Sequence, residues 1–185
     1  MSIAIDNTVL ELSETGNVSL FSTIIKEFQV RVKEDVFKRA ISRVLSAKAG
    51  SLPLDFEVES VKIIDDGVLV AGKVRKKMLG RSIDVGVNIH VGIRMVDRQC
   101  VMFDVMSIIA AGRIPVESLL ASLFEKKIGE WTNRSGIERV VGNKMAVVVA
   151  PEILLQGFDL PIKVKPGGTW NVACIPGLMD VRFTS

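Results

Sequence analysis

The chain has 185 residues, which suits one domain, and 48% of them are apolar, which excludes the low hydrophobicity of disordered proteins. The formal net charge of +3 is too small to indicate nucleic-acid binding by itself. Aromatic residues make up 5% of the chain and Tyr is absent, which argues against stacking platforms for single-stranded nucleic acid. We expect a single domain over residues 1–185, with no nucleic acid among its partners.

Residues 1–17 predict an irregular or weakly strand-like lead-in. They contain acidic residues and lack the basic start and apolar core of an export signal. The longest unbroken apolar run, Met145–Ala150, is far shorter than the ~20 residues that cross a bilayer. As given, the chain is expected to be cytoplasmic, or exported if a leader has been removed.

Two amphipathic helices are predicted. In the first, over residues 34–48, apolar residues recur at helical spacing and acidic residues lie at the start. The second, over residues 115–131, begins with Pro115 and carries seven apolar side chains along one stripe. Burial of seven such side chains contributes on the order of 10–20 kcal/mol before entropy, so this helix requires a large apolar surface.

Strands dominate the rest of the chain. Residues 55–64 and 68–77 flank Asp65-Asp66-Gly67, a hairpin signal because Gly tolerates positive φ. Over residues 83–95 apolar and polar residues alternate strictly, and a strand of that length spans about 43 Å. Further strand-like segments are 18–32, 99–108, 137–141, 145–149, 160–165, 169–175 and 181–183, with one helical turn at 151–155.

These elements predict an α+β fold. A long, strongly curved antiparallel sheet is expected to wrap around helix 115–131, and helix 34–48 is the second, shorter helix. A strand of thirteen residues must curve or cross the whole molecule, because typical strands have ~5–6 residues. The apolar residues at alternate positions from Ile83 to Ile93 are expected to face helix 115–131.

No recognisable catalytic constellation is present. His90 is the single histidine, on the polar side of strand 83–95, and no metal-binding or nucleophile motif occurs. Cys100 and Cys174 lie in apolar strand-like runs and are expected to be free thiols. The sequence therefore predicts a protein that is not an enzyme, with no cofactor and no metal.

A basic cluster lies where segment 68–77 turns into strand 83–95. It consists of Arg75, Lys76, Lys77 and Arg81. Such a cluster can contact lipid headgroups or an anionic membrane surface, and it can equally be a solubilising loop that protects a sheet edge.

The order of elements resembles a known family. A strand enters a helix in VRVKEDVFKRAISRVL, and a long hairpin follows in VKIIDDGVLVAGKVRKKMLGRSIDVGVNIHV. FDVMSIIAAGRIPVESLLASLFEKKI leads into the second helix, and GNKMAVVVAPEILL precedes the closing strands. Over roughly residues 28–183 the chain resembles the bacterial LmeA-like phospholipid-binding proteins of the tubular lipid-binding (TULIP) group. The resemblance implies a long helix wrapped by a curved sheet, with an apolar groove for lipid tails. Family members are usually exported, and no leader is visible here.

We expect non-enzymatic binding of a lipid or another hydrophobic ligand in an apolar groove between sheet and helices. The predicted lining residues are Phe37, Ile41, Val87, Ile89, Leu120 and Phe124, and the predicted headgroup contacts are Arg75, Lys76, Lys77 and Arg81. The alternative is a structural or interaction protein with a filled core that assembles through sheet edges or a helix face. Both alternatives predict the same periodicity of apolar residues. They differ in whether the core encloses a continuous void of several hundred Å³. The oligomeric state stays open.

Overall fold

The computed structural model describes residues 2–5, 8–11, 27–46, 55–78, 81–111, 116–132, 136–158, 160 and 167–184. In chain order the elements are β1 (Ser2–Ile5), β2 (Thr8–Glu11), β3 (Glu27–Lys33), α1 (Glu34–Ser46), β4 (Asp55–Ile64), β5 (Gly67–Met78), β6 (Arg81–Met95), β7 (Val101–Ala110), α2 (Val116–Trp131), β8 (Ile137–Arg139), β9 (Ala146–Val149), α3 (Pro151–Gly157), β10 (Thr169–Ile175) and β11 (Leu178–Thr184).

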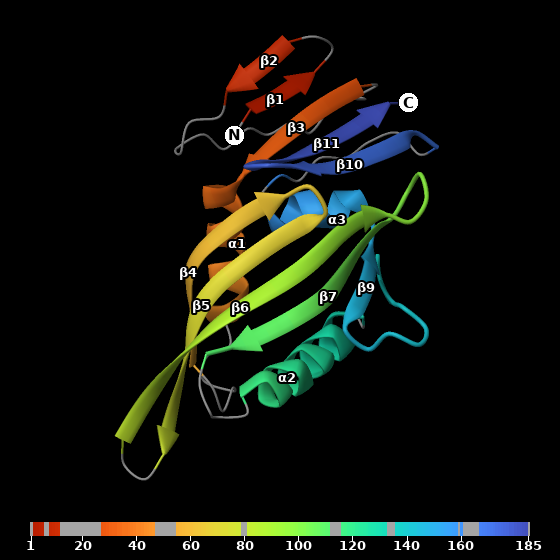
Figure 1. The fold of residues 1–185 in the computed structure, drawn as a ribbon. Helices are drawn as coiled ribbons and strands as arrows, with labels where there is room; N and C mark the ends of the chain where they lie inside the picture. Colours follow the sequence, from red (N-terminus) through yellow and green to blue (C-terminus); the bar gives the residue numbers. More distant parts are fainter. Residues whose placement is uncertain are drawn as a thin grey trace.

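The strands form two sheets (Figure 1). One has the order β10-β11-β3-β1-β2 and the other the order β4-β5-β6-β7-β9-β8, and every pairing is antiparallel. The expected α+β class and antiparallel strands are confirmed. Among the described strands neither sheet closes on itself. The sequence did not predict the division into two sheets, because β3 pairs with β11 from the far end of the chain.

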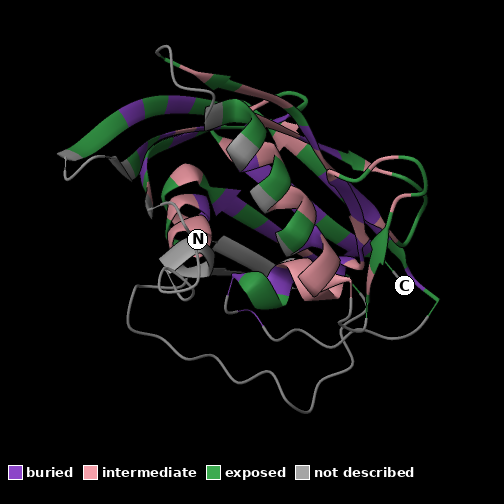
Figure 2. Cartoon of the chain, turned by 90° about the horizontal axis from the view of Figure 1, so that it is seen from below, coloured by how far each residue is buried: buried purple, intermediate pink, exposed green. Residues whose placement is uncertain are grey.

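The core lies on the inner face of the six-stranded sheet. Val85, Val87 and Ile89 of β6 are buried, and Figure 2 shows buried and exposed residues alternating along the long strands. Phe37 of α1 and Leu120 of α2 belong to the same apolar cluster as these strand residues, so both helices cover this face. Burial of the alternating residues is thereby confirmed for most of β6.

Ile83 is the exception on β6. Its side chain is 37% exposed, although the alternation predicted a buried position. β6 pairs with β7 only from Val87 onward, whereas its pairing with β5 continues to the end of the hairpin. Ile83 therefore lies where the hairpin extends past β7, and no strand among the described residues flanks it on that side.

Two bulges set which residues face the core. The pairing of β4 with β5 shifts between Val58 and Ser60. As a result the buried positions of β4 switch there from an even-numbered residue, Val58, to the odd-numbered residues Val61 and Ile63. β7 carries an extra residue, Met106, opposite the step from His90 to Val91. An extra residue interrupts strict alternation, which is why these faces could not be assigned from period two alone.

The five-stranded sheet contributes an aromatic cluster to the same core. The ring centroids of Phe28 and Trp170 lie 5.4 Å apart, and those of Trp170 and Phe183 lie 5.0 Å apart. On the other face Asp180 is 4% exposed and accepts hydrogen bonds from Gln29 Nε2 at 2.6 Å and Arg182 Nε at 2.7 Å. A buried carboxylate requires such partners, and these come from adjacent positions on β3 and β11.

Most element boundaries agree with the sequence within one to three residues. Helix 34–48 is described as far as Ser46, helix 115–131 begins at Val116, and the turn at 151–155 is α3. Of the two alternatives for the lead-in, irregular or weakly strand-like, the strand-like one holds at β1 and β2, and β1 pairs with β3. A strand of four residues is too short for its alternation to be recognised. Residues 18–26 and 161–165 lie outside the described residues.

Candidate functional site

The candidate site begins with rows of apolar residues that cross the six-stranded sheet. One row runs through directly paired positions, Val61, Val70, Ile89 and Ile108. The next row runs through Val58, Gly72, Val87 and Ala110. Val87 and Ile89, two predicted lining residues, therefore occupy the centre of the sheet, with paired strands on both sides.

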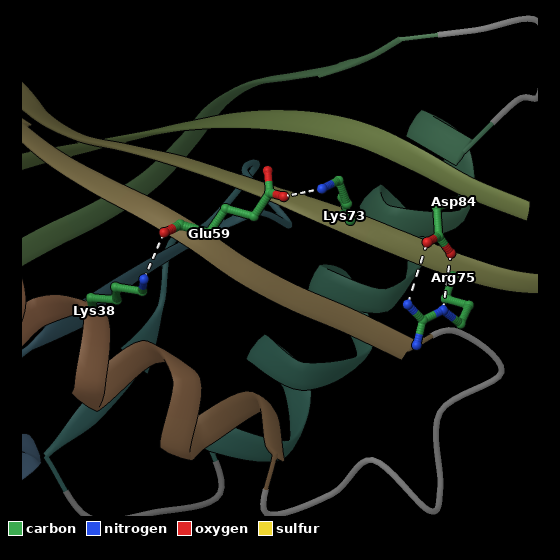
Figure 3. Close-up of polar contacts among 5 residues, drawn as sticks. All are labelled: Lys38, Glu59, Lys73, Arg75 and Asp84. Carbon is green, nitrogen blue, oxygen red and sulfur yellow. Dashed lines mark hydrogen bonds and ion pairs between the residues drawn. The ribbon is translucent and has the colours of Figure 1, made fainter.

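Helix α1 is fixed along the edge strand β4 by two side chains one turn apart. Glu34 Oε1 accepts a hydrogen bond from the backbone N–H of Ile63 at 2.9 Å. Lys38 Nζ donates to the carbonyl oxygen of Glu59 at 2.6 Å (Figure 3). These contacts satisfy backbone groups on an open sheet edge. Phe37 and Ile41 belong to the same cluster as the apolar residues of β4.

Helix α2 is held against β7 by a similar hydrogen bond. Glu117, in its first turn, accepts a hydrogen bond from the backbone N–H of Ala110 at 3.0 Å. Leu120, one turn later, is 1% exposed, and Phe124 packs half-buried against the same cluster. The side chains of Leu119 and Leu123 lie outside the described residues.

The structure brings all six predicted lining residues into one apolar cluster. Four are buried, with exposed fractions of 5% for Phe37, 2% for Val87, 3% for Ile89 and 1% for Leu120. The half-buried residues packed against this cluster include Ile41, Phe56, Ile108, Ala110 and Phe124, as well as Val91 and Met95 further along β6. Apolar side chains offer no directional hydrogen bonds, so this surface can recognise a ligand only by shape and apolar contact.

Sequence reasoning missed several aromatic members of the cluster, among them Phe56 and Phe158. Phe56 lies against the inner face at Gly72, where a Cβ atom would be 2.8 Å from its ring. Phe158 follows α3 and meets the ring of Phe37 edge-on, with centroids 4.9 Å apart. Phe56 begins the alternation of β4 and could have been assigned from it. No local pattern places Phe158 beside Phe37.

The basic cluster is only partly available to a ligand. Arg75 pairs across the hairpin with Asp84, with 3.0 Å from Nε to Oδ1 and 3.3 Å from a second guanidinium nitrogen to Oδ2 (Figure 3). This pairing lowers the pKa of Asp84. The expected headgroup contact by Arg75 must therefore compete with Asp84. Lys76, Lys77 and Arg81 lie in paired strands, but their side chains are outside the described residues.

The neighbouring acids are also engaged. Glu59 forms an ion pair with Lys73, which raises the pKa of that lysine through the hydrogen bond and the charge of Glu59 (Figure 3). Glu57 lies directly opposite Lys73 in the strand pairing. This outer face of the hairpin therefore consists of charges of both signs on neighbouring strands.

His90 lies half-buried on the outer face of β6. Its Nε2 is 3.3 Å from Asp66 Oδ1, yet it has no partner in hydrogen-bond geometry. We expect His90→Ala to change the free energy of unfolding by less than about 1 kcal/mol and to leave ligand binding unchanged. Thermal melting and a binding assay test this. A large loss of function with the fold intact would restore an enzymatic interpretation.

The two cysteines are free and half-buried. Burial raises the pKa of Cys174 from 9.0 to about 11, because the thiolate is the less solvated form inside the protein. We expect alkylation of Cys174 at pH 8 to be ~100-fold slower than for an exposed thiol, and to accelerate about tenfold per pH unit up to pH ~10. Peptide mapping after a timed iodoacetamide pulse measures the rate. Equal rates in native and urea-unfolded protein would contradict the prediction.

In the described part of the chain, no group of three or more His, Cys, Asp or Glu residues could hold a metal ion. No helix among these residues is long and apolar enough to span a membrane. Comparisons with models of protein families, with curated proteins and with solved structures find no match to this chain.

Proposed function

We propose that the protein binds a lipid or another hydrophobic ligand without catalysis, between the inner face of the six-stranded sheet and helices α1 and α2. One observation carries the proposal. Six residues from two helices and one strand, selected for their apolar spacing, belong to a single apolar cluster. An acyl chain contacts such a surface favourably, at about 0.8 kcal/mol for each buried methylene.

Two half-buried residues, Phe56 and Ala110, mark the end of the inner face at which we place ligand entry. Phe56 and Ala110 lie in the last rows of the inner face before the β5–β6 hairpin extends past its neighbours. Asp84 on β6 lies about 10 Å from Val87 toward the tip of the hairpin, at ~3.3 Å per residue, and Arg75 is its partner on β5. The apolar surface and the basic hairpin thus share one end of the sheet. A phospholipid would use both, with its tail among the apolar side chains and its headgroup near Lys76, Lys77 and Arg81.

This proposal includes the wrapped-helix arrangement that the LmeA-like resemblance implies, with α2 as the wrapped helix. The competing function is an interaction protein whose core is filled. The near-complete burial of Val87, Ile89 and Leu120 is compatible with it. In that case the same side chains would contact one another and leave no space for a tail.

Native mass spectrometry of the purified protein, before and after organic extraction, tests the proposal. We expect a bound species that extraction removes and that added phospholipid restores, together with a rise in melting temperature on adding phospholipid. A single unliganded mass, combined with a melting temperature that no lipid shifts, would favour the interaction protein.

A further inference from the structure

The β5–β6 hairpin extends beyond both neighbouring strands. In the described residues β4 pairs with β5 as far as Asp55 opposite Arg75, and β7 pairs with β6 as far as Ala110 opposite Val87, where the backbone N–H of Ala111 also donates to the carbonyl oxygen of Gly86. Past these points, among the residues that the structure describes, β5 and β6 pair with each other alone, through the pairs Lys76–Ile83, Lys77–Ser82 and Met78–Arg81. We call these three pairs the arm. Figure 1 shows the hairpin projecting from the body of the molecule.

An ion pair joins the two strands at the base of the arm. The bidentate contact between Arg75 and Asp84 joins the two strands at the last row that still has β4 beside it. A two-stranded hairpin alone is marginally stable in water. A cross-strand ion pair at its base therefore favours a defined arm and neutralises Asp84.

The arm differs from the adjoining sheet in its charge and in its exposed apolar residues. The segment KKMLGRSI between Arg75 and Asp84 carries three cations and no acid, whereas the outer face of the adjoining sheet pairs Lys73 with Glu59. The same segment contains Met78 and Ile83, and Ile83 is 37% exposed. Cations beside apolar residues match the interface of an anionic bilayer, where headgroups meet acyl chains.

We infer that the arm docks the protein on an anionic lipid bilayer, with Lys76, Lys77 and Arg81 contacting headgroup phosphates and Met78 and Ile83 entering the interface. Nucleic acid explains the cations but not the apolar residues. Docking goes beyond the proposed uptake of a ligand, because it holds even if the core is filled. It also names the surface from which a lipid would be taken.

Vesicle flotation tests the inference, using phosphatidylcholine alone and phosphatidylcholine with about one third phosphatidylglycerol. We expect wild-type protein to bind only the anionic vesicles. Binding should weaken strongly between ~0.1 M and ~1 M salt, where the screening length falls from ~10 Å to ~3 Å. The variant K76Q/K77Q/R81Q should bind at least tenfold, and on the order of 100-fold, more weakly at low salt.

Matched controls distinguish an effect of the arm from an effect of net charge or of an exposed apolar residue elsewhere. K33Q/K62Q/K126Q removes three exposed cations elsewhere and should bind almost as wild type does. Ile83→Ser should weaken binding severalfold, whereas Ile109→Ser, at a 60% exposed position on β7, should not. Circular dichroism and thermal melting confirm that each variant is folded.

Three results would overturn the inference. These are equal binding of the arm variant and wild type, equal loss in the control triple variant, and binding to a DNA oligonucleotide in place of vesicles. Failure of ligand uptake is a separate outcome. If native mass spectrometry finds no ligand while arm-dependent flotation persists, docking stands and the proposed function fails. If uptake is intact and flotation is absent, only docking fails.

Discussion

Val87→Trp is expected to abolish ligand uptake while lowering the stability of the ligand-free protein only modestly. Val87 is 2% exposed, and its direct neighbours on β5 and β7 are Gly72 and Ala110. An indole ring at this point would occupy the space that an acyl chain is proposed to fill. Native mass spectrometry and thermal melting with and without phospholipid measure the two effects.

A filled core predicts a different result for the same change. The ring would then have to displace Phe56, which already lies against Gly72, and overpacking of this kind typically costs ~1–3 kcal/mol or more. Val101→Trp is the matched control, because Val101 is fully buried on β7 in the same cluster but is not one of the six proposed lining residues. Equal destabilisation by both variants, with no lipid effect on wild type, would contradict the proposed site.

Gly67→Ala is expected to destabilise the fold strongly. Gly67 ends the Asp65-Asp66-Gly67 turn with φ 157°, and a Cβ atom there would lie 2.1 Å from the carbonyl oxygen of Val91. That oxygen belongs to the backbone of the paired strand and cannot move without disturbing the sheet. Strain and the forced shift together should cost about 2–4 kcal/mol in the free energy of unfolding. The melting temperature should fall by roughly 4–16 °C.

Gly86→Ala is the control for this prediction. Gly86 is exposed on the paired strand β6, and among the described residues the nearest atom to its added Cβ would be the Cβ of Ala111 at 3.9 Å. We expect a change within about 0.5 kcal/mol. Similar melting temperatures for the two variants would show that the hairpin adjusts at the turn, contrary to the expectation.

The candidate site was predictable from the sequence to the extent that it depends on local periodicity. Alternation along β6 identified Val87 and Ile89, and helical spacing identified Phe37 and Leu120. Local periodicity could not locate the end of the sheet, so the exposure of Ile83 was not predicted. It could not pair charges either, because the contact of Arg75 with Asp84 depends on the register of the hairpin.

By itself, the sequence determined the antiparallel strands, the two long helices and the turn at Gly67, because the period of a strand or helix and the backbone freedom of Gly are local properties. The tertiary structure alone decided that there are two sheets, through the pairing of β3 with β11. It also decided the bulges at Glu59 and Met106 and the burial of Asp180. These features depend on contacts between residues far apart in the chain, and the spacing of neighbouring residues carries no information about such partners.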